Sequence, residues 1–169
     1  MRPLADWLAD ANHCEELEFC SVHPYPLLVH ITTGYKLRPV ERMAMTIDRA
    51  VLAAATRPVT SPSAIDDYLA LEVRSQGRVR TFQLSVGCGP NCDIQINDVT
   101  VSNVHAYMTQ DRHGNWYVQD ASSTTGTHVN DRDPGETQVL VSGDRISFGM
   151  VDFTFLLPSQ AYHLVRRLV

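Results

Sequence analysis

The sequence lacks long apolar runs and has few cysteines. No stretch approaches the ~20 consecutive apolar residues that a membrane-spanning helix requires. The opening MRPLADWLADA contains two aspartates where a signal peptide would be apolar. The chain has only four cysteines, too few and too scattered for the disulfide framework of a small secreted protein. These absences predict a reduced, cytoplasmic protein with no membrane partner.

Positive charge is scarce as well. The net charge of the 169-residue chain is −5 at pH 7, and the one visible cluster of basic residues is the pair Arg166-Arg167. A chain with this balance is not expected to bind nucleic acid. Its 44% of hydrophobic residues is ordinary for a globular protein with a substantial core.

Motifs for nucleotide or acyl-transfer chemistry are missing. The sequence contains no Walker A loop, no G-x-G-x-x-G and no G-x-S-x-G. Ser102 precedes His105 by three residues, but in a strand these positions point to opposite faces, so a nucleophile–base pair would need a turn between them. We therefore predict no catalytic residues and a protein that is not an enzyme.

The cysteines could form a metal or redox site. Cys88 and Cys92 stand in the turn LSVGCGPNCDIQI (84–96), but no second pair follows at the spacing of a zinc ribbon. Cys14 and Cys20, with nearby histidines, are irregularly spaced, and a thioredoxin-type pair would require C-x-x-C. The spacing predicts no metal and no cofactor.

The first sixty residues predict a small α/β extension. Helical spacing occurs near the start and again from Pro39 to about Ala55, separated by a short apolar strand, Pro26 to Ile31. An exposed apolar stripe of this size would favour aggregation or an interface. We therefore expect Trp7 and Met43 to be buried against the chain or a second copy, which makes residues 1–60 a candidate surface for homo-oligomers. The proline-rich segment TRPVTSPSA (56–64) predicts a linker.

From Tyr68 onward the hydrophobic period changes to two. Short alternating segments separated by turn residues predict a mainly β fold, an antiparallel β-sandwich over about 66–157. Apolar residues at helical spacing then predict a C-terminal helix over 158–169. The residues expected to be mostly buried in the sandwich are Leu69, Leu71, Phe82, Leu84, Ile94, Ile96, Trp116, Val118, Ile146 and Phe148.

Three polar clusters fall between the predicted strands: GCGPNCD (87–93), TVSNVH (100–105) and DASSTTGTHVN (120–130). Functional residues on a rigid sandwich usually lie in such loops. Their hydroxyl, amide and backbone N–H groups are suited to hold an oxyanion or an extended peptide. From composition alone, turns that bind nothing are an equal alternative.

In this order and spacing, the clusters resemble the forkhead-associated (FHA) domain, a β-sandwich that binds phosphothreonine peptides. The resemblance spans roughly 66–157 and includes the closing stretches SGDRISFG (142–149) and VDFTF (151–155). The matching positions, in chain order, are Gly87, Asp93, Ser102, His105, Asp120, Ser123, Gly126, Thr127, Val129 and Asn130.

The resemblance implies roles for these residues. Gly87, His105, Gly126 and Asn130 would support the loops. The residues in or near the binding surface would be Cys88, Ser102, Asn103, Thr124 and Thr125, with Ser102 contacting the phosphate. The implied partner is a protein or phosphoprotein with a threonine-containing segment.

Two departures from the family pattern affect binding. The phosphate-binding arginine is replaced by Cys88, and the peptide-anchoring asparagine by Thr125. The resemblance makes the turn that holds Cys88 the first ligand loop, in which Cys92 is expected to be a buried turn residue. An Arg–phosphate contact contributes about 1.5–3 kcal/mol, so its loss predicts binding weakened roughly ten- to a few hundred-fold.

Three hypotheses follow. A degenerate FHA module that binds an unphosphorylated partner is preferred. A working phosphothreonine reader could use a cation from elsewhere, such as Arg78, Arg80 or Arg132. A metal or hydrolytic protein is the least favoured.

Overall fold

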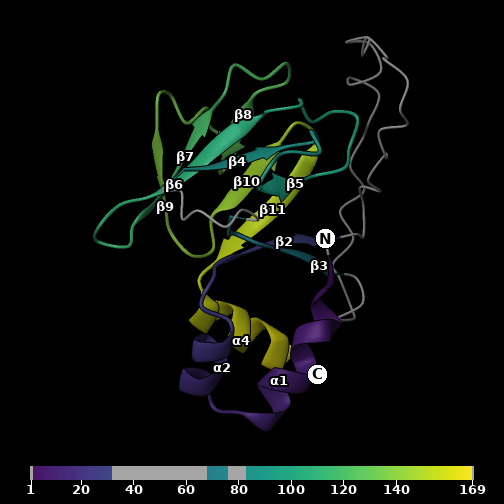
Figure 1. The fold of residues 1–169 in the computed structure, drawn as a ribbon, viewed down its shortest axis with the longest axis vertical. Helices are drawn as coiled ribbons and strands as arrows, with labels where there is room; N and C mark the ends of the chain where they lie inside the picture. Colours follow the sequence, from purple (N-terminus) through teal and green to yellow (C-terminus); the bar gives the residue numbers. More distant parts are fainter. Residues whose placement is uncertain (1, 32–67, 76–82, 169) are drawn as a thin grey trace.

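The computed structural model describes residues 2–31, 68–75 and 83–168 of the chain, and it is mainly β. Two sheets face each other above a small group of helices (Figure 1). The helices are η1 (Leu4–Trp7), α1 (Leu8–His13), α2 (Glu16–Val22) and α4 (Pro158–Arg167). The strands are β1 (Arg2–Pro3), β2 (Leu27–Ile31), β3 (Tyr68–Glu72), β4 (Gln83–Gly87), β5 (Ile94–Gln95), β6 (Ala106–Gln110), β7 (Trp116–Asp120), β8 (Thr127–Val129), β9 (Gln138–Leu140), β10 (Arg145–Phe148) and β11 (Val151–Leu156).

One sheet has the strand order β1-β3-β2-β11-β10-β8 and the other β5-β4-β6-β7-β9. Every pairing between these strands is antiparallel except the short parallel contact of β4 with β5. The predicted sandwich is therefore confirmed, with one short parallel pairing that the alternation could not show. Alternating residues from both sheets fill the space between them, and Phe148, Phe153 and Phe155 are its largest fully buried side chains.

The N-terminal segment contributes strands to this sandwich. The predicted strand is present as β2, but it lies inside the larger sheet, between β3 and β11. Thr154 of β11 pairs with Val29, and Leu71 of β3 pairs with Leu28. The sequence pattern predicted the strand but could not show which sheet it joins. The proposed domain division near residue 60 stays a prediction.

Strand β3 is covered on both of its faces, which the sequence did not predict. Leu71, which was expected in the core, is half-buried and packs toward it together with the buried Val73. Ala70, which alternates with Leu69 and Leu71, is buried on the other face, as is Tyr68, because the helices cover that face. Seven of the ten expected core residues are buried, Leu69 and Leu71 are half-buried, and Phe82 lies outside the described residues.

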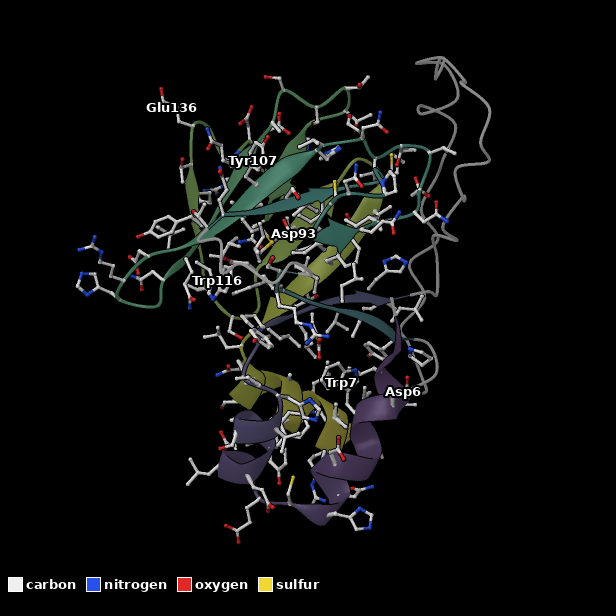
Figure 2. The ribbon with its side chains drawn as sticks, in the orientation of Figure 1. Asp6, Trp7, Asp93, Tyr107, Trp116 and Glu136 are labelled. Carbon is white, nitrogen blue, oxygen red and sulfur yellow. The ribbon has the colours of Figure 1, made fainter. Side chains whose placement is uncertain are left out.

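A second apolar cluster lies between the outer face of the larger sheet and the helices. Trp7 from η1, Phe19 from α2, and Ala161 and Val165 from α4 meet there. Trp7 is 2% exposed, which confirms its predicted burial, and Figure 2 shows it among the helices, away from Trp116 in the sandwich. The predicted helix at 39–55, with Met43, lies outside the described residues.

The predicted C-terminal helix is present as α4. It begins with a proline at its first position, where the missing N–H group costs no hydrogen bond. Its arginines, Arg166 and Arg167, fall in the last turn, where positive charge interacts favourably with the helix dipole. Within the parts of the chain described here, no helix is both long and apolar enough to cross a membrane.

Candidate functional site

The first two polar clusters and residues 120–126 of the third meet at one end of the sandwich, and we call residues 87–93, 100–105 and 120–126 the loop cluster. Strands β4, β6 and β7 are antiparallel neighbours, so the end of β4, the start of β6 and the end of β7 lie at the same end of their sheet. The rest of the third polar cluster forms strand β8, which starts at Thr127 in the facing sheet. The topology therefore gathers segments that are far apart in sequence.

The first two loops are joined through their backbones. The N–H groups of Cys88 and Gly89 donate to the carbonyl oxygens of Ser102 and Asn103, each at 3.0 Å. A Cβ atom on Gly87 would lie 2.2 Å from the Asn103 carbonyl oxygen, and one on Gly89 would lie 2.8 Å from it. Glycine is required at Gly87 because the two chain segments run too close for any side chain. The role expected for Gly87, to support the binding loops, thus has a steric explanation.

Both cysteines of the first loop contact Asn103. The buried thiol of Cys92 donates to the Asn103 carbonyl oxygen at 3.0 Å, and the half-buried Cys88 thiol reaches Asn103 Oδ1 at 3.5 Å. The predicted burial of Cys92 is confirmed. Burial raises the pKa of the Cys88 thiol, helped by the charge of Asp98 and opposed by a backbone hydrogen bond. Cys88 is therefore a neutral thiol near pH 7.

Ser102 and His105 do make contact, but not as a nucleophile and its base. The backbone N–H of Ser102 donates to His105 Nδ1 at 3.0 Å, so the other ring nitrogen carries the hydrogen and donates to the Gly126 carbonyl oxygen at 3.1 Å. The imidazole is fully buried, and burial lowers its pKa. Ser102 Oγ instead accepts from the N–H of Thr124 at 3.1 Å. One ring nitrogen therefore closes the loop 100–105 on itself, and the other joins this loop to Gly126 of the third loop.

The third loop is organised by Asp120. Its carboxylate accepts from the hydroxyls of Ser123 and Thr127, both at 2.7 Å, and from the Ser123 N–H at 3.0 Å. Burial opposes its ionisation, but these hydrogen bonds together hold the pKa of Asp120 below its ordinary value. Ser123 Oγ also accepts from the Gly126 N–H at 3.0 Å. The loop is therefore shaped before any ligand arrives.

Asn103, Thr124 and Thr125 were expected in or near the binding surface, and their environments differ. Asn103 and Thr124 are exposed at the loop tips. Thr125 is half-buried, and its hydroxyl donates to the Thr100 carbonyl oxygen at 3.0 Å. In this structure Thr125 joins two loops, and its contact with a peptide stays a prediction.

Sequence reasoning missed Asp98 and Thr100. Thr100 Oγ1 donates to the buried Asp98 carboxylate at 2.6 Å and accepts from the Met150 N–H at 3.0 Å. A Cβ on Gly149 would lie 2.4 Å from the Thr100 carbonyl oxygen. The spacing D-x-T, in which a carboxylate accepts from the N–H two residues later, could have revealed this turn.

Asn130 is not part of the loop cluster. It lies beyond the opposite end of β8, with a positive φ of 51°, and its amide bridges Asp144 Oδ1 at 2.8 Å and the Arg145 N–H at 3.0 Å. These bonds join segments at the far end of β8, away from the three loops. His128 does lie beside the cluster, where its ring packs against Gly126.

Of the candidate relocated cations, the one that the structure describes is remote from the loop cluster. Arg132 lies at the far end of β8, where its backbone bridges Val129, and the nearby Arg145 forms an ion pair with Asp131. Arg78 and Arg80 lie outside the described residues. Among the residues that the structure does describe, no group of three or more His, Cys, Asp or Glu side chains is arranged to hold a metal ion.

The chain is similar in sequence to known proteins. The family model of the FHA domain matches residues 84–149. The chain is 41% identical over 73 residues to an oxoglutarate dehydrogenase inhibitor of Corynebacterium diphtheriae and 40% identical over 72 residues to the glycogen accumulation regulator GarA of Mycolicibacterium smegmatis. Each match covers 43% of this chain, and 49% and 44% of the relatives. The chain thus spans about half the length of these curated relatives.

FHA domains are among the solved structures that can be overlaid on this chain. One from a Chlamydia trachomatis protein overlays on 78% of this chain and 96% of its own, with a TM-score of 0.48 and 15% identity. Another, from a study of phosphothreonine-dependent FHA interactions, covers the same shares of the two chains with a TM-score of 0.47 and 16% identity.

Proposed function

We propose that this protein is a non-catalytic interaction module that binds a threonine-containing segment of a protein partner through the loop cluster, with phosphate recognition weakened. The match of the FHA family model to residues 84–149 supports this proposal. The observation that carries this proposal is a fully assembled set of loops with a neutral thiol, Cys88, at the position where the family places its arginine.

The available donors support binding of a peptide more than of a dianion. Asn103 and Thr124 are exposed, and the half-buried Ser102 hydroxyl lies beside Thr124. All are uncharged, and the Cys88 thiol is neutral because burial raises its pKa. Hydrogen bonds to charged donors are roughly twice as strong as neutral ones. When cysteine stands in place of the arginine, binding of a peptide backbone is weakened little, whereas a phosphate group loses its strongest contact.

A role in regulation is proposed from the relatives. Their names describe an enzyme inhibitor and a regulator of glycogen accumulation. Since the match covers only about half of each relative, the partners of those proteins are not carried over. We propose only the shared element, a loop cluster that engages another protein, acting in the cytoplasm.

The decisive experiment restores the missing cation. Calorimetry of the natural protein with matched threonine and phosphothreonine peptides should show little preference for the phosphorylated form. Cys88→Arg should strengthen phosphopeptide binding by roughly ten- to a few hundred-fold, because arginine can donate two parallel hydrogen bonds to one phosphate. Cys88→Ser, which removes the thiol without adding charge, is the matched control and should leave binding unchanged.

A second substitution tests whether the loops hold the phosphate as expected. On the Cys88→Arg background, Ser102→Ala should weaken phosphopeptide binding by about 0.5–1.5 kcal/mol or somewhat more, as for a lost hydrogen bond to a charged group. In the natural protein the same change should have little effect. Low-micromolar binding of the phosphopeptide by the natural protein would refute the weakened site and require a cation from elsewhere in the chain.

A further inference from the structure

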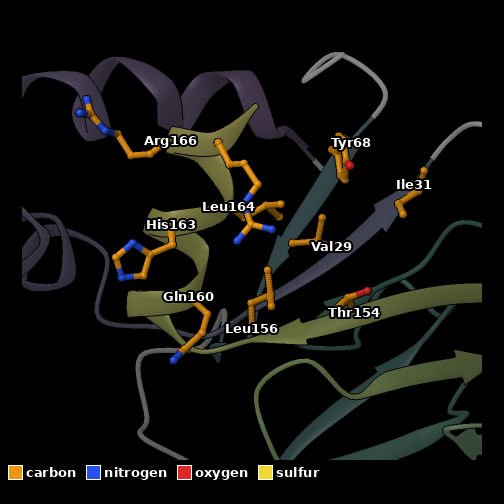
Figure 3. A pocket seen from close by; sticks show the side chains of 10 residues that line it. Val29, Ile31, Tyr68, Thr154, Leu156, Gln160, His163, Leu164 and Arg166 are labelled. Carbon is orange, nitrogen blue, oxygen red and sulfur yellow. The ribbon is translucent and has the colours of Figure 1, made fainter. Parts of the chain in front are cut away.

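The pair Arg166-Arg167, the one basic cluster in the sequence, has no part in the loop cluster. It lies at the rim of a pocket of about 790 Å³ between α4 and the outer face of the larger sheet (Figure 3). The pocket is separate from the loop cluster. Strand β11 starts next to Met150, whose N–H donates to Thr100, and reaches the pocket at Thr154 and Leu156, about 13 and 20 Å further along at ~3.3 Å per residue.

The pocket has an apolar floor. Val29 and Ile31 of β2 and Leu156 of β11 supply it, and Leu164 of α4 closes one side. Figure 3 shows the side chains of Val29, Leu156 and Leu164 converging between the helix and the strands. A volume of this size lies within the ~300–1,000 Å³ range of ligand pockets, which are mostly apolar with a few polar groups.

The rim of the pocket carries two arginines. The exposed side chains of Arg166 and Arg167 line it, together with that of His163. The Arg166 guanidinium donates to Asn12 Oδ1 at 3.2 Å, and His163 Nε2 lies 3.4 Å from the carboxylate of Glu16. Within the described residues, Arg167 has no ion-pair or hydrogen-bond partner. On a chain of net charge −5, this is a local concentration of positive charge beside apolar surface.

We propose that this pocket is a second docking site, for an acidic peptide segment of a partner protein that anchors an apolar side chain. The floor would take a leucine-sized side chain, and Arg167 would pair with a carboxylate next to that anchor. An amphipathic segment in a groove, with anchors at i, i+3 and i+4, is a recurring mode of peptide recognition. The charge complementarity selects acidic segments and disfavours basic ones.

The test uses the full chain and a defined probe. A fluorescein-labelled peptide with leucines at i, i+3 and i+4 and glutamates elsewhere is titrated by anisotropy, against a version with lysine in place of glutamate. The acidic peptide should bind saturably and more weakly as salt rises, and the basic peptide should not bind. No saturation by the acidic peptide up to about 1 mM, or equal binding of both peptides, would overturn the proposal.

Two substitutions locate the site. Arg167→Glu should weaken binding of the acidic peptide by about tenfold or more, because it replaces the attraction by repulsion. Arg112→Glu makes the same charge change on the exposed turn after β6 and should have no effect. Thr154→Trp, which fills the pocket without altering charge, should also remove binding. Equal effects of the two charge reversals would overturn the assignment.

Other occupants are distinguished in the same series. Binding to phosphatidylglycerol vesicles but not to the acidic peptide would assign the pocket to a lipid surface and refute the peptide. Self-association in the ultracentrifuge that Arg167→Glu abolishes would assign it to a second copy and refute the partner segment. If Cys88→Arg fails to strengthen phosphopeptide binding, the proposed function is refuted but the pocket is unaffected, so the two proposals fail separately.

Discussion

The loop cluster and the helical end of this protein differ in the interactions that hold them together. At the loop cluster, the backbone N–H groups of Cys88 and Gly89 donate to Ser102 and Asn103, and buried polar side chains such as Asp98 and His105 hold the turns. At the helical end, Trp7 and Phe19 pack against apolar residues of the larger sheet. Hydrogen bonds therefore shape the loop cluster, and apolar burial shapes the helical end.

This difference shows which substitutions each end tolerates. A hydrogen-bonded loop depends on atoms at fixed positions, so a single added methyl group can disrupt it. An apolar cluster is sensitive mainly to lost volume, since removed side chains leave cavities. The two proposed ligands differ in the same way. The loop cluster would bind the polar backbone of a peptide, whereas the pocket would bind an apolar side chain with a carboxylate beside it.

The largest expected effect is at the helical end. Trp7→Ala should lower the free energy of unfolding by about 3–5 kcal/mol, because the side chain is almost wholly buried and a cavity would remain. Urea denaturation followed by circular dichroism measures the loss. Leu17→Ala on α2 is the matched control, since Leu17 is 84% exposed, and should stay within about 0.5 kcal/mol.

That variant also tests whether the two ends unfold together. Strands β1 and β2 belong to the larger sheet, which predicts one transition, shifted as a whole by Trp7→Ala. A split into two transitions, with the sandwich unaffected, would show that residues 1–31 form a separate unit.

A smaller loss is expected at the loop cluster. Gly87→Ala should destabilise the protein by about 1–3 kcal/mol, because its methyl group would meet the backbone oxygen of Asn103, which cannot move without breaking the Gly89 bond. Gly135→Ala serves as the comparison, because a Cβ atom on Gly135 would have no other atom within 4 Å, while the residue has a positive φ of 64°. This variant should lose about 1–2 kcal/mol of stability from backbone strain alone. A Gly87→Ala variant as stable as the natural protein would contradict the close approach of the two loops.

The smallest expected effect concerns pH. Burial lowers the pKa of His105 from its ordinary 6.5, opposed by the Gly126 carbonyl and Asp120 and aided by His128. Between the lowered value and 6.5 the unfolded chain binds more protons than the folded chain. The contribution of His105 to stability is thus complete above about pH 6.5 and falls as the pH drops through this window.

Denaturation at pH 5 and pH 7 measures this dependence. His105→Gln should reduce the difference between the two pH values, and His113→Gln, on an exposed turn, should leave it unchanged. If His105→Gln leaves the difference in stability between pH 5 and pH 7 unchanged, a group other than His105 causes the pH dependence.

Much of the fold could be predicted because hydrophobic spacing reports local geometry. Period-two alternation predicted the strands that contain Leu84, Val118 and Ile146, and helical spacing predicted α1 and α4. The alternation at β3 failed, because helices cover the face on which Tyr68 and Ala70 lie. Coverage of both faces removes the contrast on which the pattern depends.

The site was predictable as far as residue types and their order allow. Gly87, Ser102, His105 and Gly126 were singled out from the sequence, and the structure brings all four together. Asn130 belongs to the same motif but lies at the other end of β8. The hydrogen bond from Thr125 to Thr100 could not be predicted, because it joins loops whose residues lie 25 positions apart in the chain.

Local spacing and residue identity were sufficient to establish the β-sandwich, the three polar loops and the absence of an arginine at position 88. The folded chain was needed to show that β2 enters the larger sheet, that His105 bonds Gly126, and that Arg167 lies at the same pocket as Val29 and Leu156. Each of these is a relation between distant segments. Such relations are selected by how all the buried surfaces fit at once, and no single stretch of sequence contains that information.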